Sequence, residues 1–473
     1  MPAKGEGDLR ARMMKEEVKL LQDERIQNYK DFYNNIIPKR MPIGLSIPDR
    51  VIAARLGLSG IDIHYSPSVL DDEKRKLASM FYSDTNPFSA GATILSRGPG
   101  FFNLMKSQSF VMAQNGFMQH PEVIGMHADE YQQLIDDPMS LLYDVVIPRQ
   151  YKTFGMNAAA AVNYFNMGMA WLRTVTEEAA PVVRELNEEY GYWPGAPRGS
   201  STGSVAPFDF IADQLRSFSE ISKDIRRNRE QVKEACDALV PLMFDWGMPT
   251  APDRQGMVRI PLHMPTFMRE KDFSELWMPS FLRLAEQWAA RGVRTRIFCE
   301  DDWTRLLDSI QDMPYNSELQ FEYGDFQTIK DKIGPKYIIT GMFPLHYVGR
   351  ATVEEMLDKA KEMLDIMLPG GGYLWGFDKG PLVAGDINID NYAALGEFVR
   401  DYAVYDNAGE TYGQPTNFEN YTIDPSIEVL PDSPYIFNWD RFKKEYPLVP
   451  DSAEKQFKLL QKAQLDTMLQ LLR

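Results

Sequence analysis

The residues best able to do chemistry in this chain follow five short apolar runs in its second half. In chain order, they are His263, Cys299, Glu300, Asp325, His346 and Asp378. Histidine, cysteine and carboxylate side chains exchange protons and bind divalent metals. If the runs are neighbouring strands, these side chains form one site, and the chain is an enzyme.

The apolar runs alternate with segments of helical periodicity. The runs are 257–262, 293–298, 318–321, 337–340 and 372–375, and the predicted helices are 270–291, 301–311, 325–333, 352–367 and 390–404. This alternation is typical of parallel βαβ units. Parallel strands end at one edge of their sheet, so residues that follow them collect at one rim. In (β/α) barrels, that rim carries the active site.

The spacing of the strands fits a barrel and a doubly wound sheet equally well. A dinucleotide-binding sheet would require a Gly-x-Gly-x-x-Gly turn that opens a helix after a strand, and none follows these runs. We therefore expect an α/β fold with a (β/α)8 TIM barrel over residues 71–405. Residues 1–70 are predicted to be an N-terminal helical extension, and 406–473 a C-terminal tail and helix that wraps the barrel or joins a subunit interface.

Further helices are predicted outside the alternating region, over 8–36, 157–188 and 452–473, with a helix pair over 207–247. The first reads as an exposed helix that packs across the domain or onto a second subunit. The Gly-rich and Ser-rich segment 193–204 is either a plain connector or a lid near the site.

Composition narrows the functional class. Lys and Arg number 51 against 67 Asp and Glu, which gives a net charge of −16 and argues against a broad nucleic-acid surface. The two cysteines, Cys236 and Cys299, are far apart, which fits a reducing cytoplasm better than a disulfide framework. No apolar stretch reaches the roughly 20 residues of a membrane span, so we expect a cytoplasmic protein without a membrane partner.

Several of the strand-end acids also have a purely structural interpretation. Asp301 and Asp302 are suitably placed to cap a following helix, and Asp325 is suitably placed to cap the next one. Capping explains the positions of Cys299 and Glu300 less well than those of the aspartates. Together with the two histidines, Cys299 and Glu300 suggest a divalent metal, most plausibly zinc, with an open position for Lewis-acid chemistry.

The strand-end motifs resemble, in chain order, the landmarks of the uroporphyrinogen decarboxylase-like superfamily. The motifs are His-Met-Pro-Thr-Phe-Met at 263–268, Trp-Met-Pro-Ser at 277–280, Phe-Cys-Glu-Asp-Asp-Trp-Thr-Arg at 298–305, Phe-Glu-Tyr-Gly-Asp at 321–325, Ile-Thr-Gly-Met-Phe-Pro at 339–344 and Gly-Gly-Gly-Tyr-Leu at 370–374. The branch that the chain resembles is the corrinoid-dependent methyltransferases, especially the O-demethylase component that acts on methoxylated aromatics.

This resemblance implies a zinc-assisted transfer of a methyl group from a methoxylated aromatic donor to the cobalt of a corrinoid (cobalamin) on a separate protein. It also implies roles for individual residues. The implied catalytic residues are Glu300, Asp325 and His263, the implied substrate contacts are Trp303, Phe267, Tyr323 and Phe343, and the implied metal ligands are Cys299, Glu300, His346 and Asp378. A homodimer is one expected assembly.

The chain departs from the family pattern in several places. Residues 1–60 lack the Arg-rich substrate motif of the decarboxylase branch. A His-x-Cys pair of thiol-methylating relatives reads Ile297-Phe-Cys299 here, and their late cysteine falls near Asp378. An asparagine usual after the fourth run is Met342. The metal site therefore either uses a different ligand set or has been lost.

Three functional hypotheses remain open from the sequence. The first is a methyltransferase that acts with a corrinoid protein. The second is a lyase of the decarboxylase type, for which a cluster of arginines should face the barrel mouth. The third is a diverged paralogue with another activity or a non-catalytic binding role, for which substitution of Cys299 and Glu300 should have no effect on metal content or turnover.

Overall fold

A computed structural model describes residues 6–89, 99–114, 116–414 and 418–472. Its centre is one parallel sheet whose strands are hydrogen-bonded in chain order. They are β3 (Thr202–Gly203), β4 (Met257–Leu262), β5 (Arg294–Asp302), β6 (Glu318–Tyr323), β7 (Ile338–Phe343) and β8 (Tyr373–Phe377). The five predicted apolar runs correspond to β4 through β8, so the prediction of consecutive parallel strands is confirmed. β3 has no apolar run and was not predicted.

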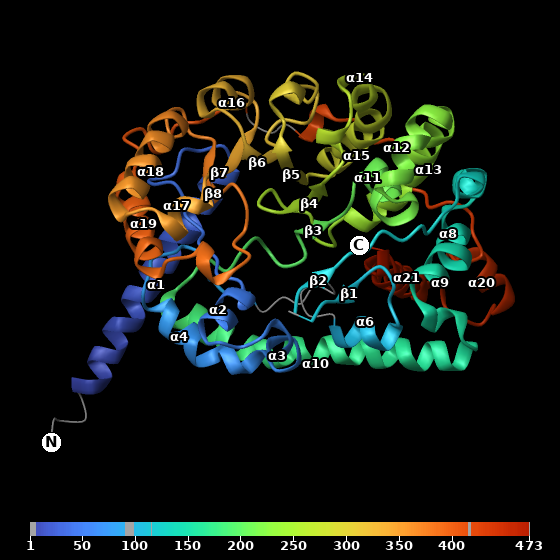
Figure 1. Ribbon diagram of the computed structural model, residues 1–473, viewed down its shortest axis with the longest axis horizontal. Helices are drawn as coiled ribbons and strands as arrows, with labels where there is room; N and C mark the ends of the chain where they lie inside the picture. Colours follow the sequence, from blue (N-terminus) through green and yellow to red (C-terminus); the bar gives the residue numbers. More distant parts are fainter. Residues whose placement is uncertain (1–5, 90–98, 115, 415–417, 473) are drawn as a thin grey trace.

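Helices cover the outer face of this sheet (Figure 1). They are α15 (Met278–Ala290), α16 (Phe326–Ile333), α17 (Leu345–Arg350), α18 (Val353–Met367) and α19 (Ile389–Tyr402). The predicted helix at 301–311 is wrong. Asp301 and Asp302 prolong β5 through a bulge, where Asp301 has a φ of 61°, and only Thr304–Leu306 forms a helical turn. A bulge re-aims the strand end, which sequence periodicity does not reveal.

The sheet has the parallel α/β arrangement of a barrel, although it contains only six paired strands in the described residues. Extended segments at 41–47 and 83–87 run beside its open side. The backbone N–H of Asp84 donates to Ile43, that of Trp193 donates to Asp84, and that of Ile47 donates to Pro87. These segments line the same cavity as β4 and β8, so they complete the wall that two further strands would form.

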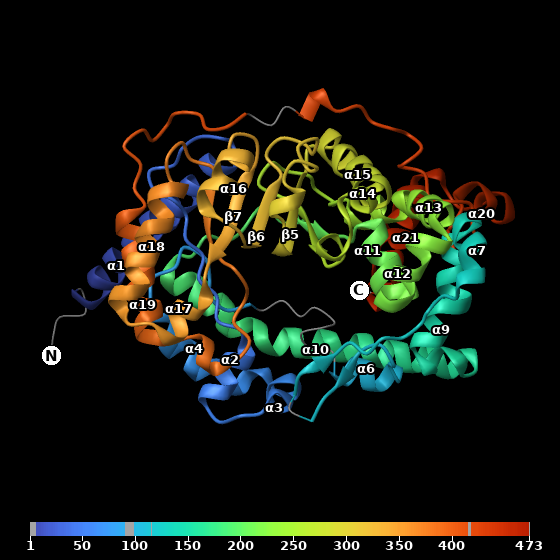
Figure 2. The same ribbon diagram turned by 45° about the horizontal axis from the view of Figure 1, so that its top comes forward.

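Helices from the first half of the chain lie opposite the sheet (Figures 1 and 2). They include α2 (Asp49–Arg55), α3 (Gly60–Tyr65), α4 (Asp71–Ala78), α6 (Pro99–Met105) and the long α10 (Ala158–Tyr190). Two short strands, β1 (Val111–Met112) and β2 (Met118–Gln119), form a hairpin on this side. The helix α1 (Glu6–Tyr33) instead reaches the starts of β4, β7 and β8, where its last turns share a hydrophobic cluster with Met257, Ile338 and Leu374. One face of the C-terminal half of α1, with Tyr29, Phe32 and Tyr33, is buried, so this helix packs across the domain, as one of the two alternatives predicted, while its other face is exposed.

The predicted helix pair at 207–247 divides into several elements. They are α11 (Pro207–Phe210), the π-type turn η5 (Ile211–Arg216), α12 (Phe218–Arg227) and α13 (Arg229–Gly247). The tail ends in α20 (Trp439–Glu445) and α21 (Glu454–Leu469), and α21 packs on α13.

One hydrophobic core joins residues from all three predicted segments, including Met41, Leu262 and Leu472. The division at residues 70 and 405 stays a prediction. Among the described helices, none combines the length and the apolar character that crossing a membrane requires.

Candidate active site at the strand ends

Strand alternation sets which residues face the inside of the barrel. In β4 and its continuation, Arg259, Pro261 and His263 are open to the interior, whereas the residues between them are buried against the helices. In β5, Glu300 is half-buried on the interior side and Cys299 is fully buried on the other side. Because neighbouring strand residues point to opposite faces, His263 and Glu300 meet at the rim and Cys299 does not.

The centre of the rim is the imidazole of His263, which lies between two carboxyl groups. Its Nδ1 is 3.9 Å from Oδ2 of Asp213, and its Nε2 is 3.8 Å from Oε2 of Glu300. These distances suit electrostatic contact or a bridging water better than direct hydrogen bonds. The structure therefore brings together two residues that the sequence predicted and one that it did not.

Asp209 holds His263 in place. This carboxylate is fully buried and accepts the backbone N–H groups of His263 at 2.8 Å and Met264 at 3.0 Å, as well as the indole N–H of Trp277. Asp209 and Asp213 lie four residues apart after β3, in a segment that is otherwise mostly apolar. Two acids at that spacing in an apolar helix were the available sequence signal for this part of the site.

The carboxyl groups at the rim favour their protonated forms. Burial, and then the neighbouring charge of Asp209, raise the pKa of Asp213 to about 7. Burial also raises the pKa of Glu300; the charge of His263 opposes this effect in part, and the charge of Glu322 adds to it. A carboxylic acid that keeps its proton near neutral pH can donate it to a leaving oxygen or to a carbanion.

A second cluster of charged side chains extends the rim along β6 and β8. Glu322 accepts the backbone N–H of Asp301 at 2.9 Å and lies 3.6 Å from the amine of Lys379. Lys379 also donates to the hydroxyl of Tyr323 at 3.2 Å. Since Lys379 lines the cavity inside the barrel as well, it connects the rim with that cavity.

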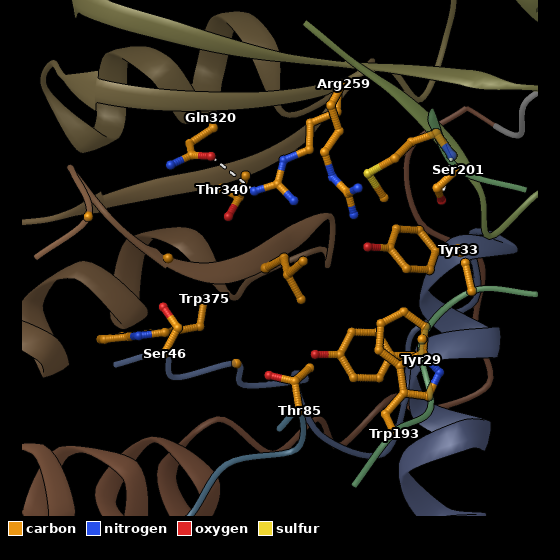
Figure 3. Close-up of a pocket in the computed structure, with 18 of the residues that line it drawn as sticks. Tyr29, Tyr33, Ser46, Thr85, Trp193, Ser201, Arg259, Gln320, Thr340 and Trp375 are labelled. Carbon is orange, nitrogen blue, oxygen red and sulfur yellow. Dashed lines mark hydrogen bonds between the residues drawn. The ribbon is translucent and has the colours of Figure 1, made fainter. Parts of the chain in front are cut away.

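The barrel encloses a cavity of about 540 Å³ beneath the rim. Arg259, Tyr33 and Tyr29 point into it, and the ring of Trp193 stacks on Tyr29 with 3.8 Å between centroids (Figure 3). Part of the Gly-rich segment after Trp193 also lines this cavity. The two tyrosines come from α1, a contribution that local periodicity cannot predict.

A second and larger cavity, of about 900 Å³, lies beside the hairpin of β1 and β2. Its walls include Phe110, Met118, His120, Leu382 and Val383. The imidazole of His120 stacks on Phe110, and burial followed by the charge of His263 lowers its pKa. His120 is thus within electrostatic range of the rim.

The four predicted metal ligands do not assemble. Over residues 6–89, 99–114, 116–414 and 418–472, no three His, Cys, Asp or Glu side chains are grouped to hold a metal. Cys299 faces the helices, His346 is an exposed residue of α17, and Asp378 accepts the N–H groups of Leu345 and Lys379. Glu300 alone of the four faces His263. The residues present therefore do not fit a zinc ion, and no step below depends on one.

The predicted substrate contacts are also placed differently from one another. Trp303 and Phe343 are buried in the core, where Trp303 packs edge-on against Trp277, and neither lines the two cavities. Tyr323 is exposed at the rim, and Phe267 is exposed and touches Phe218.

Asp325, predicted to be catalytic, acts as a helix cap. Its carboxylate accepts the backbone N–H and the hydroxyl of Thr328, both at 2.8 Å, at the start of α16. The hydrogen bonds from Thr328 lower its pKa. The alternative structural interpretation of this residue accounts for its position.

Replacing Cys299 by alanine tests its structural role. We expect a loss of roughly 1 kcal/mol in the free energy of unfolding, because a small buried side chain is shortened, and no change in turnover or metal content. Urea unfolding, an activity assay and elemental analysis measure these quantities. A loss of bound metal in the variant would contradict this placement of Cys299.

Comparison with known proteins gives one family match. Residues 201–402 match the family model described as uroporphyrinogen decarboxylase (URO-D). Among solved structures, the chain is similar to a methyltransferase from Methanosarcina mazei at 13% identity and a TM-score of 0.48, over 81% of this chain and 98% of that one. No curated protein sequence matches it. The family match covers every strand of the parallel sheet, and its family is the one that the strand-end motifs resemble.

Proposed function

We propose that this protein is a methyltransferase that moves a methyl group from a small methoxylated aromatic donor to the cobalt of a corrinoid on a separate protein. The observation that carries the proposal is the rim group in which His263 lies between Asp213 and Glu300. Demethylation of an ether leaves an oxygen anion, and a nearby protonated carboxyl group makes that oxygen a better leaving group.

The proposed step balances as a displacement. Cobalt(I) supplies an electron pair to the methyl carbon, the carbon–oxygen bond breaks, and the proton of Asp213 passes to the departing oxygen. Glu300, whose pKa burial also raises, is the alternative donor on the other side of the ring. Asp209 acts as a positioning residue, because it holds the backbone of His263 rather than the substrate.

The larger cavity supports the same proposal. A corrin ring needs a wide and largely apolar approach, and the aromatic and aliphatic walls around Phe110, Phe117 and Leu382 offer one. His120 joins this cavity to the electrostatic environment of His263. We propose that the corrinoid protein presents its cofactor from this side.

Single-turnover assays with free cobalt(I) cobalamin and a panel of methoxyarenes test the function. The loss of the cobalt(I) absorption reports methyl transfer, and we expect at least one donor to react. His263→Ala should react much more slowly with the same donor. Absence of transfer from every donor, to free cobalamin and to corrinoid proteins alike, would contradict the proposal.

A decarboxylase-type lyase is the second candidate, and the arginines inside the barrel favour it. Arg259 and Arg296 are register partners on β4 and β5, and both line the interior cavity, as a substrate with several carboxylates would require. The same rim acids could protonate the carbanion that decarboxylation leaves. Release of carbon dioxide from porphyrinogen carboxylates, without methyl transfer, would favour this candidate.

A further inference from the structure

The interior cavity is positively charged, although the whole protein has a net charge of −16. Its lining includes Arg198, Arg259, Arg296 and Lys379 and contains no aspartate or glutamate. A cleft of one charge with protein walls concentrates its field on the enclosed volume. The cavity therefore selects anions from a surrounding surface that repels them.

The two central arginines differ in their partners. The guanidinium of Arg296 lies 3.2 Å from the buried carboxylate of Glu318 and donates to Gln320 at 2.9 Å, the bond drawn in Figure 3. For the guanidinium of Arg259, no ion-pair partner is found in the described part of the chain, and its register neighbour is Arg296. Burial and the charge of Arg296 lower the pKa of Arg259. The charge of Glu318 acts on Arg259, but no carboxylate of the described residues lies within ion-pair distance of its guanidinium.

The opposite wall of the cavity is aromatic. Tyr29 and Tyr33 lie four residues apart on one face of α1, and Trp193 stacks on Tyr29. The hydroxyl groups of both tyrosines point toward the interior (Figure 3). A flat ring fits against such a wall, while the tyrosine hydroxyls and the guanidinium of Arg259 can bind its carboxylate.

We propose that the barrel interior contains an anion-binding site for a small aromatic carboxylate, with the carboxylate on Arg259 and the ring against Tyr29 and Trp193. Arg259 lies four positions before His263, and Arg296 lies four positions before Glu300, which is about 13 Å along the strands. The site is therefore distinct from the proton-donating group at the rim, and its ligand need not carry a methyl group.

Isothermal titration of the full-length protein with benzoate tests the site directly. We expect saturable binding to one site, at least tenfold weaker binding of benzyl alcohol, which lacks the charge, and weaker binding of acetate, which lacks the ring. Arg259→Gln should weaken benzoate binding at least tenfold, and Arg259→Lys should give an intermediate value, because lysine keeps the charge but loses the planar fork.

Arg441→Gln is the matched control, since Arg441 is exposed and pairs only loosely with Asp432, at 3.5 Å. It should bind benzoate like the unmodified protein. Urea unfolding of each variant shows whether Arg259→Gln is folded; if it is not, Arg259→Lys and the benzyl alcohol comparison still decide. No benzoate binding, or equal binding by Arg259→Gln, would overturn the proposal. Because neither probe carries a methyl group, this result is independent of the methyltransferase assay.

Discussion

Replacing Asp213 by asparagine is expected to slow methyl transfer at pH 7 by about 100-fold or more, the usual contribution of a positioned general acid. The carboxyl group lies 3.9 Å from His263, and its raised pKa of about 7 keeps much of it protonated at that pH. Asparagine has nearly the same shape but cannot donate an acidic proton. Single-turnover rates with the best donor measure the effect.

The same substitution should stabilise the protein in alkaline solution. An aspartate titrates near 3.9 when unfolded and at about 7 here, so the folded state binds more protons between these values. Its contribution to the free energy of unfolding therefore becomes unfavourable as the pH rises from 4 to 7 and remains so above. The full difference corresponds to about 4 kcal/mol, and we expect roughly 2 kcal/mol at pH 8, since the side chain is not fully buried.

Asp213→Asn should consequently unfold at a higher urea concentration than the unmodified protein at pH 8, and at a similar one at pH 4. Asp432→Asn is the control, because this acid is almost fully exposed and should change neither quantity. A variant that loses stability at pH 8, or keeps its full rate, would contradict the role of Asp213. Gain of stability with loss of activity is typical of a functional residue.

Replacing Asp84 by alanine is expected to lower the free energy of unfolding by about 3 to 5 kcal/mol, the cost of removing one partner from a buried ion pair. Its side chain is 1% exposed and accepts both terminal nitrogens of Arg40, at 2.6 and 2.7 Å, and Nε of Arg25, at 3.2 Å. It also accepts the N–H of Ile43 and the hydroxyl of Tyr82. Removing it leaves two buried arginines without their main anion.

The consequences of this change should reach the interior cavity. Arg25 is one helical turn before Tyr29 on α1, and Thr85, which follows Asp84, lines the cavity. Burial raises the pKa of Asp84, but the hydrogen bonds and charge of Arg40 outweigh it and the pKa is lowered. The stabilisation is therefore present above about pH 4 and is lost as the pH falls through the folded-state pKa. Urea unfolding at pH 7 measures the loss of stability in Asp84→Ala, with Asp432→Asn as the control. A loss of less than 1 kcal/mol in the free energy of unfolding would contradict this role of Asp84.

The strands were predictable because each is a short apolar run with a clear end. The alternation of side chains along those runs also predicts correctly that His263 and Glu300 face the interior at the rim. The same alternation implies that Cys299, next to Glu300, faces the helices. The two side chains could bind one metal only if the strand were twisted by half a turn between them. The bulge at Asp301 follows both residues, so it does not bring their side chains to one face of the sheet.

The rest of the site depends on long-range packing. Asp209 and Asp213 reach the rim because α11 follows β3, a strand of two residues with no apolar run. Tyr29 and Tyr33 reach the cavity because the ion pairs of Asp84 fix α1 on the open side of the sheet. Neither arrangement has a local sequence pattern, although acidic residues within an apolar helix indicate buried carboxyl groups with a functional role.

The pH dependence of methyl transfer in a single turnover tests most directly whether the rim group of Asp213, His263 and Glu300 supplies the proton. With the best donor and free cobalt(I) cobalamin, the rate should be highest at low pH and fall about tenfold per pH unit above pH 7, as Asp213 loses its proton. Asp213→Asn should have a lower rate without this decrease. A rate that does not change between pH 6 and 9, or the same decrease in Asp213→Asn, would contradict the account.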